Sequence, residues 1–245
     1  MKKLLAGTVF AALVGGIASA ADMPVAPPAY RPPDPVVAHF TWTGCYGGAN
    51  AGALLVRNNT SMGAPPYTGS PALGASLGGH DASGWLAGLQ LGCNYQLGNW
   101  VLGAQGEFDW ADAEGSHPDP FFASTTDRSR TRQLMEMTWR VGYAWNGFLA
   151  YFKAGGAWER IDYAMATSTP ALNAFSARET GGWTVGIGGE YAIAEWLSAF
   201  AEYRYLDFGT CTNSFVNGLG TFIANVNIRD TKNIVKAGFN LRIGR

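Results

Sequence analysis

The chain has 245 residues, a formal net charge of −1, 47% hydrophobic residues and only 14% charged residues. A soluble domain usually carries about 25% charged residues, so this composition is typical of a protein whose surface faces lipid. The nearly neutral net charge argues against nucleic acid as a partner, and the length allows one domain of about 200 residues after an export signal.

The N-terminus has the features of an export signal. Lys2 and Lys3 precede an apolar stretch from Leu4 to Ile17, and the small residues Ala18-Ser19-Ala20 form a cleavage site. The alternative is a helical membrane anchor, but the apolar stretch is short and lacks a charged stop on its far side. We therefore expect a cleaved signal peptide over residues 1–20, with the mature chain starting near Ala21.

Residues 21–41 form a proline-rich segment, with six prolines between Met23 and Pro35. Such a segment is extended and cannot join a sheet ladder. We interpret it as an N-terminal periplasmic tail, and a ligand for a proline-binding groove is the alternative. A β-barrel over residues 42–245 is then expected to follow.

Eight segments alternate apolar and polar residues at period two, as strands with one apolar face do. The clearest runs from Trp85 to Leu97, where the odd-numbered positions carry the large apolar side chains. The predicted strands are Thr43–Leu55, Ser83–Leu97, Trp100–Trp110, Arg132–Trp145, Phe148–Tyr163, Gly182–Ile193, Trp196–Phe208 and Asp230–Ile243.

The connections between these strands alternate in length. Three are two-residue turns, at Gly98-Asn99, Asn146-Gly147 and Ala194-Glu195, and we expect both central residues of an Asn-Gly turn to take positive φ. Four are long and polar: Val56–Ala82, Ala111–Thr131, Ala164–Gly181 and Gly209–Arg229. This pattern predicts an all-β fold, an eight-stranded antiparallel transmembrane β-barrel with short periplasmic turns and four long extracellular loops.

Tryptophans lie at the ends of the apolar faces. Trp100 and Trp110 bracket one strand, and a tilt near 40° puts them about 25 Å apart along a membrane normal, the height of an outer-membrane apolar band. We predict an aromatic girdle at the membrane surfaces, formed by Trp85, Trp100, Trp110, Trp145 and Trp183.

The opposite face of the strands carries charge. Six acids and five bases continue the alternation and are expected to fill a narrow lumen as ion pairs: Glu107, Asp109, Glu136, Arg140, Lys153, Glu159, Glu190, Glu202, Arg204, Lys236 and Arg242. The alternative is a sheet surface that faces water. Trp196 and Phe200 share the parity of Glu202, which predicts either a bulge or aromatics packed in the periplasmic mouth.

Three segments resemble a known family. They are Trp42-Thr43-Gly44-Cys45-Tyr46-Gly47-Gly48, Glu202-Tyr203-Arg204-Tyr205-Leu206-Asp207-Phe208-Gly209, and Asn233-Ile234-Val235-Lys236-Ala237-Gly238-Phe239-Asn240-Leu241-Arg242. Together they are similar to the small outer-membrane immunogenic porins of alphaproteobacteria, whose barrel is similar to the transmembrane domain of outer membrane protein A. The resemblance implies an abundant surface-exposed barrel, and some members of the family bind haem. It also implies a C-terminal signal for the barrel-assembly machinery, although Cys45 and the end Ile243-Gly244-Arg245 depart from the usual aromatics.

Few residues suggest catalysis or metal binding. His39, His80 and His117 lie in the tail and predicted loops without ligand spacing. Ser116, His117, Asp112 and Asp119 are the only grouping that could mimic a hydrolase, which needs serine, histidine and carboxylate within hydrogen-bond reach. A chance grouping in a polar loop is the competing interpretation. Gly186-Ile187-Gly188-Gly189 lies within a strand and opens no helix, so it is interpreted as making room in the lumen.

The arginines and cysteines leave alternatives open. Arg128, Arg130 and Arg132 form a basic cluster that suits lipopolysaccharide phosphates or is merely a solvated loop edge. Cys45 and Cys93 are either a disulfide or two small lipid-facing residues, with the second preferred, and Cys211 is left over as a free thiol or an intermolecular bridge.

The sequence therefore predicts a non-enzymatic outer-membrane barrel, exported from the cytoplasm, with a structural, surface-interaction or limited porin-like role and a lumen filled by paired charges. The alternatives are a lipid-modifying enzyme that uses residues near His117, or a surface protein that binds haem or a small solute. No cofactor or metal is predicted. The expected partners are membrane lipid, lipopolysaccharide, the assembly machinery and surface ligands bound through the loops.

Overall fold

The computed structural model describes residues 40–64, 72–118, 125–167, 173–217 and 222–243. The predicted signal peptide, nearly all of the proline-rich segment and His39 lie outside the described residues, and so does Asp119. No helix in the described part of the chain is long and apolar enough to cross a membrane.

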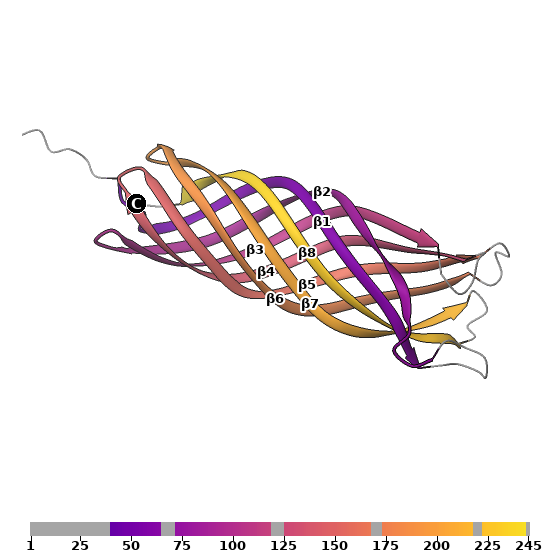
Figure 1. Ribbon diagram of the computed structural model, residues 1–245. Coiled ribbons are helices and arrows are strands. Elements are labelled where there is room, and N and C mark those ends of the chain that lie inside the picture. Colours follow the sequence, from indigo (N-terminus) through magenta and orange to yellow (C-terminus); the bar gives the residue numbers. More distant parts are fainter. Residues whose placement is uncertain (1–39, 65–71, 119–124, 168–172, 218–221, 244–245) are drawn as a thin grey trace, which may run out of the picture. The chain divides into compact units, whose positions relative to one another are not determined.

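Eight antiparallel strands pair in chain order, and the last pairs with the first to close a barrel (Figure 1). This confirms the predicted fold class. The strands are β1 (Gly44–Ala64), β2 (Ser76–Leu97), β3 (Trp100–Pro118), β4 (Thr125–Trp145), β5 (Phe148–Thr167), β6 (Ala174–Ala194), β7 (Leu197–Asn217) and β8 (Phe222–Ile243).

The strands are longer than predicted at one end only. At the end that carries the two-residue turns, here called the short-turn end, the predicted limits are correct to within about two residues. At the opposite end, the long-connection end, most of each predicted loop is strand, so that only residues 65–75, 119–124, 168–173 and 218–221 connect the strands. The prediction of four long loops was wrong in this respect, because ladder pairing continues beyond the point where the outward face stops being apolar.

The tight turns differ from the prediction in their backbone. Asn146 has φ 53° and Gly98 has φ 60°, but the second central residue of each turn is not in the positive-φ region. Positive φ at the first central residue alone is the pattern of a type II′ turn. This turn suits the twist of a hairpin as well as the type I′ turn does, in which both central residues have positive φ. The third turn is formed by Glu195 and Trp196, one residue later than predicted.

A bulge in β4 reverses its faces. Thr131 pairs with Ile161 and Gln133 with Arg160, so Arg132 is an extra residue without a partner on β5. One extra residue exchanges the two faces of a strand. As a result, even-numbered residues point inward below the bulge, as at Glu136, and outward above it.

The lumen is filled by alternating apolar and polar layers. Along the first strand, inward side chains follow the order Trp42, Tyr46 and Asn50, then Leu54 and Val56, then Asn58 and Thr60, then Met62, and all of them are buried. We call the layers, from the short-turn end, the basal apolar layer around Trp42 and Leu149, the central charged layer, the middle apolar layer around Leu54 and Ile234, the histidine layer, and the distal apolar layer around Met62 and Phe215.

Trp42 closes the short-turn end. Its backbone N–H donates to Gln96 Oε1 at 2.6 Å and its indole N–H donates to the carbonyl of Asn146 at 3.3 Å. Arg242, which was predicted to belong to the lumen charges, instead lies at this rim, with its guanidinium 4.5 Å from the Phe40 ring centroid. It is the last inward position of β8, where the charged part of the lumen has already ended.

The seam between β6 and β7 is incompletely paired. Phe175 pairs with Val216, but the ladder between β6 and β7 resumes only at Trp183 and Asp207. Side chains cross this interval: Arg178 donates to the carbonyl of Thr212, and Thr180 Oγ1 lies 3.0 Å from Cys211 Sγ. The extended strands beyond the apolar band are therefore joined less tightly here than between β4 and β5, whose ladder continues to Thr125 and Thr167.

Cys45 and Cys93 face each other across β1 and β2, and both are exposed on the outer surface. They form a disulfide. The preferred interpretation, two unlinked lipid-facing residues, was therefore wrong about the bond and correct about the direction of the side chains. Directly opposed residues of an antiparallel pair have Cβ atoms close enough for a disulfide, but alternation alone does not fix the register.

The outward faces predict a strongly position-dependent cost of charge. Leu89 is 56% exposed and Leu102 is 48% exposed, both in the middle of the band that the sequence predicts to face lipid. We expect Leu89→Arg or Leu102→Arg to lower the free energy of unfolding in lipid vesicles by about 2–4 kcal/mol. Asn59→Arg, at an outward position of β1 beyond this band, is the control and should be nearly neutral. Equal costs at both kinds of site would contradict a lipid-facing surface.

Candidate functional site

The central charged layer places nine ionisable side chains in contact inside the barrel, all of them buried. They come from six strands and comprise five carboxylates and four cations: Glu107, Asp109, Glu136, Glu190 and Glu202, with Arg140, Lys153, Arg204 and Lys236. Each was predicted from alternation to share one face, and the structure brings this set together.

Arg204 is the hub of this layer. Its Nη2 lies 3.0 Å from Glu107 Oε2, its Nε lies 3.0 Å from Glu202 Oε1, and its Nη1 donates to Glu136. One guanidinium therefore joins strands β3, β4 and β7, using the planar fork of donors that suits carboxylates. Gly186 faces the neighbouring strand closely, because a Cβ there would be 2.7 Å from the carbonyl oxygen of Tyr203 and 3.1 Å from Arg204 Cγ.

Two lysines and Arg140 complete the pairing. Lys153 Nζ lies 2.7 Å from Glu202 Oε2, and Arg140 Nη1 lies 3.0 Å from Glu190 Oε2. Lys236 Nζ contacts Glu107 and lies 3.2 Å from Asp109 Oδ2. Buried charge is tolerated only when it is paired and hydrogen-bonded, and these contacts meet that requirement.

Three of the carboxylates are close enough to hold a cation. Glu107, Asp109 and Glu136 each offer an oxygen, and these oxygens lie within 4.8 Å of one another. However, Lys236 and Arg204 already occupy this space with positive charge, contacting Glu107 from two sides. The arrangement therefore needs no metal ion to be neutralised.

Neutral polar side chains extend the network and were missed by the sequence analysis. Tyr46 donates to Gln105 Oε1 at 2.8 Å, and Lys153 donates to the same oxygen at 2.9 Å. Asn50 donates to Gln90 at 2.9 Å, and Gln90 donates to Asn240 at 2.9 Å. The signal that could have found them is parity, since they share the face of the charged residues.

The histidine layer contains a second ion-pair group. Lys232 Nζ lies 2.8 Å from Glu159 Oε2 and 2.6 Å from Asp230 Oδ2. Glu159, which was predicted to belong to the lumen charges, is therefore separated from the central layer by the middle apolar layer. Lys232 and Asp230 were missed although they share the parity of Lys236.

His80 and His117 meet inside the barrel, contrary to the expectation that the histidines lie apart in loops. They are on β2 and β3, with their Nδ1 atoms 3.0 Å apart. His117 Nε2 is 3.1 Å from the carbonyl oxygen of Leu77, which can only accept, so this nitrogen carries the proton. His80 then donates from Nδ1, and its Nε2 accepts from the Ser129 hydroxyl at 2.7 Å.

The hydrogen-bonded order of these residues resembles that of a hydrolase triad, but the site has no space for a substrate. Ser129, His80 and His117 lead to Asp127, whose Oδ2 is 3.6 Å from His117 Nε2. The cavity beside them has a volume of about 20 Å³, enough for about one water molecule. The geometry therefore supports a buried hydrogen-bond network that joins β2, β3 and β4.

The predicted grouping around His117 does not form. Ser116 is exposed on the outer face of β3, whereas His117 is buried on its inner face. Asp112 also points outward, where it accepts from Arg130 at 2.9 Å. Adjacent residues of a strand point to opposite sides of the wall, so Ser116 and His117 cannot act on one substrate.

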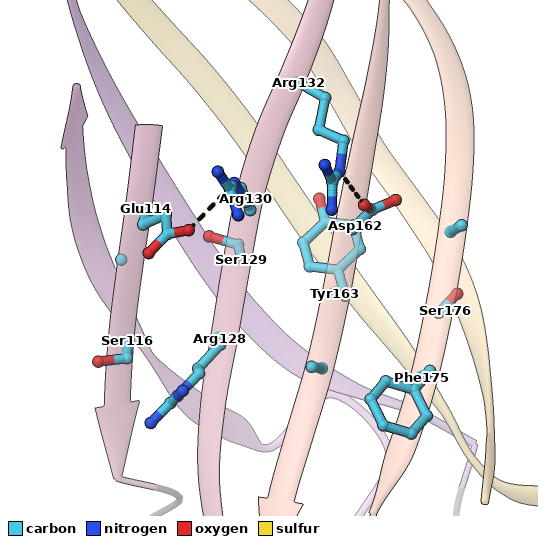
Figure 2. A pocket seen from close by; sticks show the side chains of 13 residues that line it. Glu114, Ser116, Arg128, Ser129, Arg130, Arg132, Asp162, Tyr163, Phe175 and Ser176 are labelled. Atoms are coloured by element: carbon cyan, nitrogen blue, oxygen red, sulfur yellow. Dashed lines mark hydrogen bonds and ion pairs between the residues drawn. The ribbon is translucent and has the colours of Figure 1, made fainter. Parts of the chain in front are cut away.

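A hollow of about 530 Å³ lies on the outer surface, where β3, β4, β5 and β6 extend toward the long-connection end (Figure 2). Arg128, Arg130 and Arg132 line it as consecutive outward residues of β4, a placement that depends on the bulge at Arg132. Asp162 of β5 and Phe175 of β6 form the other side.

The five predicted girdle tryptophans all lie on the outer surface. Trp100 and Trp145 are near the short-turn end, and Trp85, Trp110 and Trp183 are near the other limit of the apolar face; each is about half exposed. Trp139 and Trp158 were not predicted as part of this set but are also outward and exposed.

Comparison with known proteins assigns the chain to a family. The model of the outer membrane protein beta-barrel domain matches residues 8–242. The chain belongs to this outer-membrane family. It is 30% identical over 219 residues to the 31 kDa outer-membrane immunogenic protein of Brucella melitensis, an alignment covering 85% of this chain and 88% of that protein. The 25 kDa outer-membrane immunogenic protein of Brucella abortus is 26% identical over 210 residues, covering 85% and 84%.

The family places this barrel in the outer membrane, as predicted, and its relatives are named for that location and for their immunogenicity. Among solved structures, the outer membrane protease OmpT from Escherichia coli superposes with a TM-score of 0.52 at 9% identity, covering 83% of this chain and 98% of that one. At that identity the likeness shows a shared fold alone.

The central layer predicts a large cost for removing its hub. Arg204→Ala leaves Glu107, Glu136 and Glu202 without their shared cation, and breaking a buried ion pair on one side typically costs about 3–5 kcal/mol. We expect a loss of this size in urea unfolding of protein inserted in vesicles. Arg160→Ala, an exposed outward arginine on β5, is the control and should change the free energy of unfolding by less than about 1 kcal/mol.

The histidine layer predicts local loosening in acid. Burial, and then the neighbouring His117, lower the pKa of His80, while Asp230 and Asp81 oppose the shift. A histidine whose folded pKa is lowered binds fewer protons folded than unfolded, so its stabilising contribution falls as pH drops below about 6.5. The protection factors of amides near His80, which correct exchange rates for the intrinsic effect of pH, should therefore fall between about pH 7 and 5.

His80→Gln is the matched variant for this measurement. A glutamine offers hydrogen-bonding groups but does not titrate, so we expect the acid-dependent fall in protection factors around β2 and β3 to be largely lost. Protection factors that fall equally in both proteins would show that the other ionisable groups, not His80, control the loosening.

Proposed function

We propose that this protein is a non-conducting, non-enzymatic outer-membrane barrel that supports the envelope and presents its long-connection end at the cell surface. The observation that carries the proposal is the stacking of layers in the lumen. Three apolar layers and two polar layers succeed each other along the axis, with their large side chains buried. A hydrated solute crossing this interior would have to displace every layer.

The strand number supports the same conclusion. An eight-stranded barrel has an interior just wide enough for its side chains to fill. Here Arg204, Lys153, Leu54 and Ile234 are among the most deeply buried side chains of the described residues. The lumen thus has the packing of a protein core, which favours a mechanical role over a limited porin-like one.

A lipid-modifying enzyme is not favoured. The residues around His117 that this alternative needs are divided between the two faces of β3, and the histidine layer is covered by the distal apolar layer of Met62, Tyr163 and Phe215. The naming of the relatives for outer-membrane immunogenicity agrees with surface presentation, by the strand ends and their connections, as the role.

Planar-bilayer recording tests the proposal. We expect the purified, folded protein to give no steady conductance, because its side chains fill the barrel. A diffusion porin inserted in the same bilayers is the positive control, and heat-modifiable migration on a gel verifies that the barrel is folded. Large and steady single-channel steps from folded protein would overturn the proposal in favour of a solute channel.

A further inference from the structure

The outer hollow of Figure 2 differs from the rest of the wall in its chemistry. Below it, the outward side chains of β4 are apolar: Val141, Trp139, Met137 and Met135 are all exposed. Above the bulge, the next three outward residues are arginines. A run of apolar residues that turns into a run of cations at one level is what a boundary between hydrocarbon and anionic headgroups requires.

The level of the hollow follows from the strand pairing. Trp110 pairs with Gln133, and Trp158 pairs with Met135, so the girdle and the last apolar residue of β4 lie side by side. The outward Gln133 and then Arg132 follow Met135, and Arg130 and Arg128 extend the run by about 10 Å at the usual rise and tilt of barrel strands. The arginines therefore begin where the hydrocarbon of the outer leaflet ends.

Two of the arginines are held in place by carboxylates. Arg130 donates to both oxygens of Asp112 at 2.9 Å, and its Nε lies 3.0 Å from Glu114. Arg132 donates through Nε to Asp162. These contacts orient the two guanidinium groups but leave further N–H donors on each of them, since a guanidinium carries five.

Arg128 is different. It is exposed, it extends toward Ser116 in Figure 2, and it forms no ion pair or hydrogen bond with any described residue. A guanidinium whose donors are not used by any described residue, next to two oriented ones, is suited to a phosphate, which accepts several charge-assisted hydrogen bonds at once. Ser116, an exposed outward residue of β3, adds a hydroxyl donor at the edge of the hollow.

The rest of the lining is apolar. Phe175 is 55% exposed, and Ala164 and Ala177 lie beside it. An inorganic ion gains nothing from apolar side chains, whereas the sugar and acyl portions of a membrane lipid can pack against them. The hollow also opens on the outer surface of the barrel. A membrane lipid can reach it from there, whereas a solute in the lumen cannot.

We propose that this hollow binds the phosphate-bearing headgroup of an outer-leaflet lipid, with Arg128 as the principal phosphate ligand. In an outer membrane this lipid is lipopolysaccharide, and its phosphates are those of the lipid A portion. Arg130 and Arg132 contribute their remaining donors, and Phe175 packs against the lipid. The site is separate from the lumen, so it does not depend on whether the barrel conducts.

Titration of the purified full-length mature protein with lipid A, followed by native mass spectrometry, tests this site. We expect Arg128→Gln to weaken the binding of diphosphorylated lipid A about tenfold, equivalent to about 1.4 kcal/mol. Arg57→Gln is the matched control, because Arg57 is also an exposed outward arginine beyond the girdle, on β1, but is paired with Asp81 at 3.3 Å. It should bind lipid A as the wild type does.

Two further measurements separate the sources of phosphate. Dephosphorylated lipid A should bind the wild type no better than diphosphorylated lipid A binds the Arg128→Gln variant. A large excess of inorganic phosphate should leave bound lipid A in place. Wild-type affinity of Arg128→Gln, or equal affinity for both forms of lipid A, would overturn the proposal, and displacement by inorganic phosphate would overturn the lipid as ligand.

Discussion

The structure depends on a constraint of closure: every polar group that points into an eight-stranded barrel has to find its partner inside that barrel. The space is too narrow for bulk water and the wall leaves no edge through which a side chain can reach solvent. Arg204 meets this constraint by contacting three carboxylates from one position. Because these carboxylates come from β3, β4 and β7, the pairing of charges also fixes which strands face each other across the lumen.

The alternation of layers follows from the same constraint. Unpaired charge is costly, so the charged groups of each polar layer form ion pairs within that layer, and apolar side chains that need no partner bound it. Lys232 with Glu159 and Asp230 forms one such self-contained group, and Arg140 with Glu190 belongs to another. The layers therefore close the lumen at several levels, and the strands of the wall and the side chains inside the lumen stabilise each other.

Most of the fold could be predicted from the sequence because a period of two is a direct record of two different environments. The polarity of a side chain such as Leu89 or Glu107 is enough to indicate which face of the wall it occupies. The strand ends beyond the band could not be predicted in this way, since both faces there are polar or mixed and the alternation disappears. The bulge at Arg132 leaves no chemical mark of its own, and neither does the register that places Cys45 opposite Cys93.

The candidate sites were predicted less well, for a related reason. His80 and His117 are far apart in sequence and meet because the register of β2 and β3, whose last pair is Ser83 with Glu114, brings them opposite each other where both strands extend past the apolar band. Ser116 and His117 are neighbours in sequence and are separated by the thickness of the wall. Proximity along a strand is thus a poor guide to proximity in a site, and only the pairing of strands corrects it.

The extended strands have a consequence for how far the strand ends lie from the membrane surface. On β5, nine residues follow Trp158 before the strand ends at Thr167, which raises the strand end roughly 20–25 Å above the girdle at the usual rise and tilt. In the proposed orientation, with the long-connection end at the cell surface, the strand ends therefore lie beyond the carbohydrate nearest the membrane. Sequence changes at these strand ends leave the apolar band of the barrel untouched.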